Sequence, residues 1–293
     1  MSKFNFTNEL IAEQTQDRPA VIGLSFATPE RNFSCEGQAR AVNVIYEDVC
    51  DNNVVWQPDV LWEAKKIADR HCMTRVIDIG CGNGDKLVHY FKGGGYNVVG
   101  IDFHGSLSLS RANYPSWQWI ECDLTSYHDL SRISGALPGE EPAILVLSDV
   151  IEHLTDPRPL VAWMRAQLMA RPGSRLVVST PDRLRLGYKS INGRPANEAH
   201  IREWSLAELE CFFLSSGLQI IRSGHTRENQ FDPLNASIFI EMSCSHEHYQ
   251  GFLVKTGLLH GNDRPRHLLV TTEYAGFHNT GGIGTFVREQ REA

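Results

Sequence analysis

The stretch VIDIGCGNGD, residues 76–85, constrains the fold of this 293-residue chain more than any other feature. Its apolar, β-branched start is typical of a buried parallel strand. Glycines then stand at alternate positions, Gly80, Gly82 and Gly84, where the backbone can turn tightly and approach a ligand that a Cβ would exclude. The run 86–91 predicts a helix whose free N–H groups face the same loop. Together these features predict a ligand-binding loop between a strand and a helix.

Further candidate strands alternate with helical stretches, which is the pattern of βαβ units and a parallel sheet. They cover residues 97–102, 117–122, 143–147 and 175–179. A helix with the capping box Ser205 and Glu208 ends at Gly217, and two more strands follow at 218–221 and 237–242. Helical spacing predicts N-terminal helices at 37–50 and 59–71. We expect an α/β fold with a seven-stranded, mostly parallel sheet and an antiparallel closing hairpin.

Acidic residues stand at the strand ends, where a cofactor would lie. Asp102 comes about 20 residues after the glycines, where an acid can accept both hydroxyls of a ribose. The G-x-G-x-G spacing, with Asp78 two residues before it, resembles motif I of the class I S-adenosylmethionine (SAM) methyltransferases. This resemblance implies a Rossmann-like fold and SAM as cofactor. The implied cofactor-binding residues are Asp78, Gly80, Gly82, Gly84, Asp102, Asp123, Leu124 and Ser148.

The chemistry is expected after the strand 143–147, because open α/β sheets bind substrate beyond the carboxyl ends of their strands. Asp149, Glu152 and His153 follow it at spacing i, i+3, i+4, so on a helical turn they would share one face. An attacking hydroxyl must lose a proton, either to a general base or with the help of a divalent metal. These three residues are therefore the candidate catalytic group.

The stretch DVIEHL resembles the E-x-x-E-H segment of the ubiquinone-pathway O-methyltransferases and of the small-RNA 3′-terminal ribose methyltransferases. In the second group two acids, the adjacent histidine and a later histidine hold a divalent metal. The matching positions are Asp149, Glu152, His153 and His200, with Asp149 in place of the first glutamate. Mg²⁺ or Mn²⁺ would suit such ligands. Three interpretations stay open: His153 as a metal-free base, a metal site, and a structural role.

A long segment without periodicity, 182–204, separates the fifth strand from the capped helix. It is locally basic in an acidic protein, with Arg183, Arg185, Lys189, Arg194 and Arg202. It is interpreted either as a solvated loop or as a lid that meets an anionic acceptor. In the second case the acceptor would contact Arg183, Arg185, Arg202 and His200.

The C-terminal segment indicates an acceptor class. A candidate strand, 267–272, leads into Thr280-Gly281-Gly282-Ile283-Gly284, which resembles the opening of a GT-B glycosyltransferase. We therefore expect a methyltransferase domain at 1–244, a linker at 245–265 and the truncated start of a fused glycosyltransferase at 266–293. A sugar hydroxyl of a glycan is then the favoured acceptor. The alternatives are a small aromatic or isoprenoid hydroxyl and a non-catalytic SAM-binding module.

The composition of the chain argues against several other classes of protein. The net charge of −7 and the pI near 5.9 weigh against binding to DNA or RNA. Seven cysteines without a C-x-x-C pair argue against a disulfide framework and favour a reducing cytoplasm. The sequence has no apolar run of about 18 residues and a polar start, so we expect neither an integral membrane protein nor a signal peptide.

Overall fold

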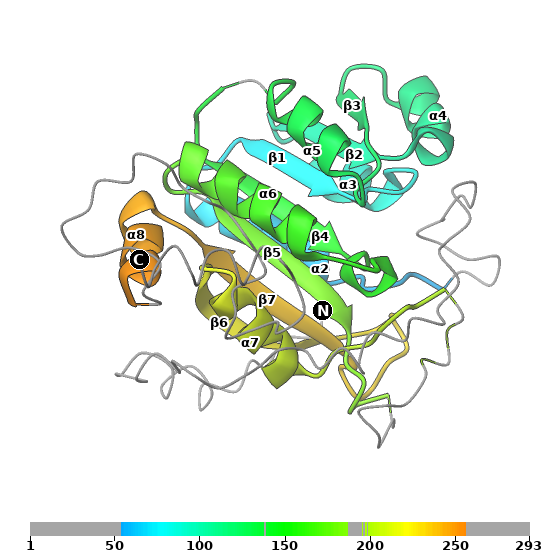
Figure 1. Ribbon diagram of the computed structural model, residues 1–293. Coiled ribbons are helices and arrows are strands. Elements are labelled where there is room, and N and C mark those ends of the chain that lie inside the picture. The colour runs from blue at the N-terminus through cyan, green and yellow to red at the C-terminus, as the bar shows by residue number, and fades with distance from the viewer. Residues whose placement is uncertain (1–53, 138, 187–194, 196, 198, 256–293) are drawn as a thin grey trace.

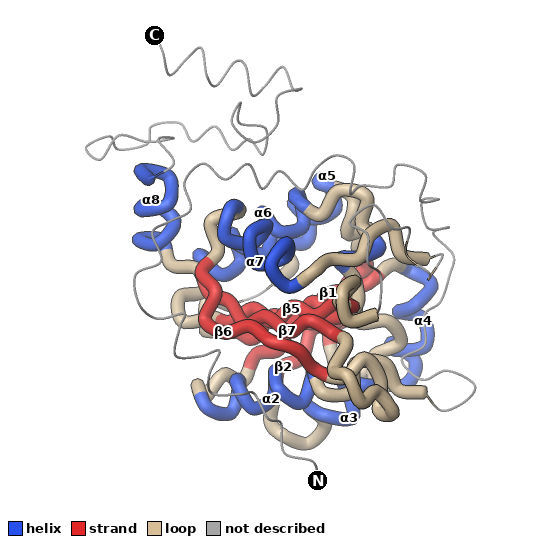
Figure 2. The backbone as a smooth tube through the Cα atoms, turned by 90° about the horizontal axis from the view of Figure 1, so that it is seen from below, coloured by secondary structure: helices blue, strands red, loops and turns tan. Residues whose placement is uncertain are grey.

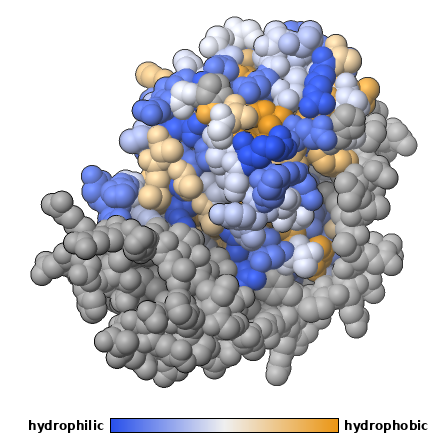
Figure 3. All heavy atoms as spheres, turned by 45° about the horizontal axis from the view of Figure 1, so that its top comes forward, coloured by the Kyte–Doolittle hydropathy of each residue, from blue (hydrophilic) through white to orange (hydrophobic). Residues whose placement is uncertain are grey.

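A computed structural model of the chain describes residues 54–137, 139–186, 195, 197 and 199–255. The predicted helix at 37–50 and the predicted glycosyltransferase-like strand and loop at 266–293 lie outside these residues. Among the described residues, no helix is long and apolar enough to cross a membrane. On the face that Figure 3 shows, hydrophilic side chains predominate and apolar patches interrupt them.

Seven strands form one sheet in the order β3-β2-β1-β4-β5-β7-β6 (Figure 1). The strands are β1 (Arg75–Ile79), β2 (Asn97–Asp102), β3 (Gln118–Glu121), β4 (Ala143–Ser148), β5 (Arg175–Pro181), β6 (Gln219–Thr226) and β7 (Ser237–Ser243). The first five pair in parallel, and β7 runs antiparallel between β5 and β6. The predicted mostly parallel sheet with an antiparallel hairpin is confirmed, although β6 extends five residues beyond the predicted end at 221.

Helices cover both faces of the sheet (Figure 2). Below it in that view lie α2 (Val60–Arg70) and α3 (Asp85–Phe91), and α4 (His104–Asn113) lies at its right. Above it lie α5 (Tyr127–Ser134), α6 (Arg158–Ala170) and α7 (Leu206–Ser215). A short 3₁₀ turn, η2 (Ile151–His153), follows β4, and α8 (His246–Lys255) follows β7. The helix predicted at 59–71 is thus confirmed as α2, and the capping box of Ser205 and Glu208 begins α7 as predicted.

Two hydrophobic cores follow from the strand alternation. In β1, Val76 packs toward α2 and α3, whereas Ile77 and Ile79 pack toward α5 and α6. All three side chains are fully buried. Because successive side chains of a strand point to opposite faces, a strand covered on both sides reads as a continuous apolar run. This explains why β1 was recognisable in the sequence.

The parallel strands bring their carboxyl ends to one edge of the sheet. β1 pairs with β2 on one side and with β4 on the other. The chain adds strands on one side of β1 as far as β3 and then crosses to the other side of β1 with β4. β5 continues the edge beside β4, with Ser148 opposite Ser179. Such a reversal point is where open α/β sheets bind their ligands. The loops after β1, β2, β4 and β5 therefore meet at one site.

The helix α8 begins inside the predicted linker 245–265. Its Tyr249 is buried in the core, and the guanidinium of Arg165 lies 4.2 Å from the centre of the Tyr249 ring. A chain ending at residue 244 would therefore lose a helix that packs on the hydrophobic core. The three-domain division stays a prediction.

Candidate functional site

The glycine loop after β1 is built for close approach. Gly80, Gly82 and Gly84 all have positive φ, at 78°, 56° and 79°. A Cβ added at Gly80 would lie 2.3 Å from Cγ2 of Val150, which belongs to the loop after β4. This position therefore requires glycine for both its φ and its packing. The contact also places the residues after β4 directly against the glycine loop.

Asp102, the last residue of β2, holds this loop in shape. Its Oδ2 accepts a hydrogen bond of 2.7 Å from the Gly82 N–H, and its Oδ1 accepts one of 2.7 Å from the Phe103 N–H. The side chain is 8% exposed. A carboxylate beside a cradle without Cβ atoms fits a ribose-bearing cofactor such as SAM, because the ribose hydroxyls need acceptors and the loop needs no side-chain volume. The hydrogen bond from Gly82 was not foreseen from the sequence.

The remaining predicted cofactor residues surround this cradle at different depths. Asp78 is buried within β1, and Ser148 ends β4, where its Oγ lies 3.0 Å from Oγ of Ser179. Asp123 is exposed, and its Oδ1 accepts hydrogen bonds from both the N–H and the Oγ of Thr125. Leu124 packs on the core. The structure places all four near the carboxyl edge of the sheet, and their contacts with the cofactor stay a prediction.

His153 has a defined tautomer. Its Nδ1 lies 2.8 Å from the carbonyl oxygen of Ala199. Because a carbonyl oxygen can only accept, Nδ1 carries the proton and Nε2 of the neutral ring keeps its lone pair. This is the state that either a general base or a metal ligand requires.

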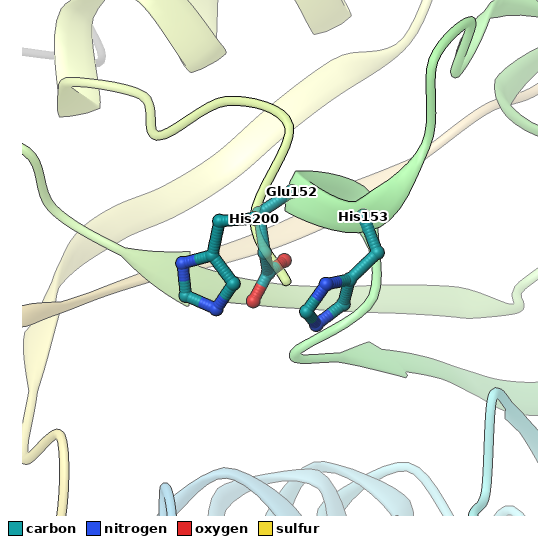
Figure 4. A group of neighbouring side chains, drawn as sticks. All are labelled: Glu152, His153 and His200. Atoms are coloured by element: carbon teal, nitrogen blue, oxygen red, sulfur yellow. The ribbon is translucent and has the colours of Figure 1, made fainter. Parts of the chain in front are cut away.

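The chain segment around Ala199 is held by Glu152. Both the Ile201 N–H and the Arg202 N–H donate to the backbone oxygen of Glu152, at 2.8 and 3.2 Å. This docking brings His200 beside His153, with ring centres 4.8 Å apart and the ring planes at 71°. In Figure 4 the Glu152 carboxylate lies between the two imidazole rings.

His200 is oriented by two polar neighbours. Its Nδ1 lies 2.9 Å from Oε1 of Glu203, and its Nε2 lies 2.9 Å from Nδ2 of Asn197. The carboxylate accepts from Nδ1, so Nε2 accepts from the Asn197 amide. Glu203 was missed in the sequence reasoning, although its position three residues after His200 was a usable signal.

Glu152 and Asp149 form a coupled acidic pair. Burial raises the pKa of Glu152 well above its ordinary value, and the Asp149 carboxylate raises it further. Burial opposes ionisation of Asp149 as well, but the hydrogen bond with Glu152 and the nearby His153 imidazole lower the pKa of Asp149. Within the pair, Glu152 is therefore the weaker acid. Oε2 of Glu152 accepts a hydrogen bond of 3.0 Å from Oγ1 of Thr180.

The structure unites three of the four predicted metal ligands. One ligand atom from each of Glu152, His153 and His200 lies within 4.8 Å of the others. Asp149 is not part of this group, because it lies before the 3₁₀ turn with a φ of 59°, and its Oδ1 accepts a hydrogen bond of 2.8 Å from Nε2 of Gln57. We expected one helical turn to carry Asp149, Glu152 and His153. The structure has only the short turn η2 here, which contains Glu152 and His153 but not Asp149.

The described arginines of the basic segment have internal partners. Arg183 is buried and pairs with Oε2 of Glu208 at 2.6 Å, and Arg185 donates to the backbone oxygen of Leu234 at 2.6 Å. Arg202 is buried with its guanidinium 4.2 Å from the centre of the Trp204 ring, and burial lowers the pKa of Arg202 to about 9. Lys189 and Arg194 lie outside the described residues. A contact with an anionic acceptor stays a prediction.

Several solved structures that resemble this chain are named as methyltransferases, and one, SpnF, is named as a cyclase. The methyltransferase domain of bacterial CtHen1-C is 17% identical, with a TM-score of 0.42, and covers 62% of this chain and 98% of its own. The O-methyltransferase NcsB1 of neocarzinostatin biosynthesis is 18% identical, with a TM-score of 0.43, and covers 61% and 51%. The glycopeptide N-methyltransferase MtfA is 16% identical, with a TM-score of 0.46, and covers 62% and 92%. No curated protein matches the sequence.

Residues 30–223 match the family model described as the methyltransferase domain. This match covers about two thirds of the chain and includes the glycine loop, Asp102 and the cluster of Glu152, His153 and His200. The glycine cradle and the mostly parallel sheet with its antiparallel hairpin agree with it. The chain therefore belongs to the methyltransferase domain family.

Proposed function

We propose that this enzyme methylates a hydroxyl oxygen and that Nε2 of His153 accepts the hydroxyl proton. The observation that carries the proposal is the hydrogen bond from Nδ1 of His153 to the Ala199 oxygen, which leaves Nε2 as the basic atom. When bound, SAM supplies a methyl group activated by its sulfonium ion. The hydroxyl oxygen forms a bond to the methyl carbon, the carbon–sulfur bond breaks, and the electron pair stays on the sulfur.

The residues around His153 orient the base rather than react. The docking of Ile201 and Arg202 on the Glu152 backbone keeps Ala199 in place, and so fixes the ring of His153. A base held in one orientation saves the entropy of alignment in the transition state. The intact histidine and its fixed tautomer also favour catalysis over the alternative of a non-catalytic SAM-binding module.

The favoured acceptor is a sugar hydroxyl in a glycan or glycoconjugate. The support for it is the resemblance of residues 266–293 to the start of a glycosyltransferase, since a fused glycosyltransferase would act on the same chain of sugars. The resemblance of Asp149, Glu152 and His153 to the ubiquinone-pathway enzymes supports an aromatic or isoprenoid hydroxyl as the second candidate.

The test is transfer of a labelled methyl group from SAM to two acceptor panels. One panel holds oligosaccharides and sugar nucleotides, and the other holds catechols and prenylated phenols. We expect a labelled methyl ether on a member of the sugar panel. Product in the phenol panel alone would overturn the sugar acceptor, and a methylated nitrogen or carbon would overturn hydroxyl transfer.

A metal-assisted mechanism is the second candidate, and the clustered ligand atoms of Glu152, His153 and His200 favour it. Oε1 of Glu152 receives no hydrogen bond from an N–H or O–H within the described part of the chain. A mixed set of one carboxylate and two imidazoles suits Mn²⁺ better than Mg²⁺, because Mg²⁺ prefers oxygen ligands. The metal would acidify the bound hydroxyl.

Chelation separates the two mechanisms. If His153 is a metal-free base, EDTA leaves the rate unchanged and His200→Ala keeps most of the activity. If the cluster holds a metal, EDTA abolishes turnover and Mn²⁺ or Mg²⁺ restores it. His200→Ala is then inactive with or without added metal ion.

A further inference from the structure

Residues 54–59 form a segment that joins the cofactor loop to the β6–β7 loop. On one side, Nζ of Lys86 donates to the Trp56 oxygen at 3.2 Å, and Oη of Tyr90 donates to the Pro58 oxygen at 2.7 Å. Both donors belong to α3, the helix that follows the glycine loop. On the other side, the Gln57 N–H donates to the Glu228 oxygen at 2.7 Å. The segment is thus anchored to two elements far away in the sequence.

Gln57 reaches from this segment into the site. It is 1% exposed, and its Nε2 donates to Oδ1 of Asp149 at 2.8 Å. Its Oε1 accepts a longer hydrogen bond, of 3.4 Å, from Oγ of Ser148. Both Gln57 and Asp149 have left-handed backbones, with φ of 44° and 59°, which few residues other than glycine adopt. Such strain concentrates at functional sites because the surrounding contacts must maintain it.

Asp149 stands where the cofactor loop and the catalytic turn meet. The next residue, Val150, packs against Gly80, so the Asp149 backbone borders the glycine cradle. Its side chain is only partly buried. A carboxylate offers about four lone-pair sites, of which Gln57 and Glu152 use two. The remaining sites can accept from a ligand.

We propose that Gln57 is a positioning residue that holds the Asp149 carboxylate ready to accept from the α-ammonium group of the bound cofactor. SAM carries two cationic centres, and only the ammonium has N–H groups to donate. A fixed carboxylate beside the cradle suits it better than the sulfonium, which cannot donate a hydrogen bond. The role of Gln57 does not depend on which acceptor is methylated or on whether His153 acts as a base or a metal ligand. It can therefore be tested separately from the proposed function.

The test compares two ligands by calorimetry. S-Adenosylhomocysteine carries the α-ammonium, whereas 5′-methylthioadenosine has the same adenosine and thioether without the amino-acid portion. Asp149→Asn should weaken binding of S-adenosylhomocysteine about tenfold, as for the loss of one charge-assisted hydrogen bond, and leave binding of methylthioadenosine unchanged. Gln57→Leu should cause a loss of the same kind, and the double variant should lose little more than Asp149→Asn alone.

The matched control is Tyr90→Phe, which removes another anchor of the same segment without touching Asp149. It should bind both ligands like the wild type. If Gln57→Leu does not fold, Gln57→Asn, whose amide is one methylene shorter, replaces it. Equal losses for both ligands, no loss for S-adenosylhomocysteine, or additive losses in the double variant would each overturn the assignment.

Discussion

The cofactor side and the acceptor side of this site are assembled in different ways. On the cofactor side, Gly82 of the glycine loop and Asp102 are 20 positions apart, and one hydrogen bond joins them directly. On the acceptor side, His153 depends on Ala199, 46 positions away, and where the two sides meet, Asp149 depends on Gln57, 92 positions away. The comparison teaches that a local motif shows which cofactor binds, whereas the reactive groups depend on distant contacts.

The acceptor side also carries more unusual electrostatics. Burial and the Asp149 charge raise the pKa of Glu152, and the pKa of Glu228 nearby is raised to about 7, first by burial and then by the Asp149 charge. Ser237 donates a hydrogen bond to the Glu228 carboxylate and opposes this shift. Buried carboxyls with raised pKa values cluster at functional sites. The sequence offered no sign of Glu228.

The largest expected effect is a loss of turnover on removal of the candidate base on the acceptor side, with cofactor binding unchanged. His153→Ala should lower kcat by about 10²–10⁴-fold, as for the loss of a general base. Calorimetry should find the affinity for S-adenosylhomocysteine unchanged, because the hydrogen bond that orients His153 comes from Ala199. A variant with normal kcat would show that His153 has a structural role, and one that no longer binds the cofactor would remove the distinction between the two sides.

Glu228→Gln probes the stability of the acceptor side. The folded-state pKa of about 7 lies above the ordinary value of 4.5, so between these pH values the folded protein holds a proton that the unfolded chain releases. The stability of the wild type therefore falls as the pH rises through this window. The variant should match the wild type near pH 5 and exceed it at pH 8, by up to about 3 kcal/mol.

Urea unfolding at the two pH values measures this difference. Glu247→Gln, on an exposed residue of α8, controls for the loss of one charge. A constant difference between Glu228→Gln and the wild type from pH 5 to pH 8 would contradict the raised pKa of Glu228.

Asp102→Ala should weaken cofactor binding. Removing the carboxylate deprives the ribose of its acceptor and Gly82 of its partner, and should weaken binding by about 1–3 kcal/mol. Calorimetry should find the loss for both S-adenosylhomocysteine and methylthioadenosine, since both contain the ribose. This outcome contrasts with that of Asp149→Asn. A loss restricted to S-adenosylhomocysteine would place Asp102 near the amino-acid portion instead.

The smallest expected effect concerns the basic segment. Arg183 is buried against Glu208, which also belongs to the capping box of α7, so Arg183→Ala should lower stability by about 1–2 kcal/mol. Arg185→Ala, which loses only an exposed bond to a backbone oxygen, should lower it less. Thermal unfolding compares the two. Unchanged stability of Arg183→Ala together with a raised KM for acceptor would instead support the predicted contact with an anionic acceptor.

The sequence predicted the sheet well because its elements repeat simple patterns. β2 and β4 begin at the predicted residues, and α7 begins with the predicted capping box. The extra length of β6 was missed, because Arg222 and His225 break the apolar pattern there. Both side chains have partners on other elements. Arg222 pairs with Glu241 on the neighbouring strand β7, and His225 lies against Asp182 after β5. Such pairs cannot be found from spacing along one strand.

The sequence by itself determined the class of fold, the glycine cradle, Asp102 and the proximity of Glu152 to His153, because each depends on neighbours within about one βα unit. Only the tertiary structure decided that Asp149 turns toward Gln57, that Ala199 fixes the tautomer of His153, and that Arg183 is bound internally. The physical reason is that side-chain orientation and protonation depend on the nearest partner in space. Folding brings those partners together from distant parts of the chain.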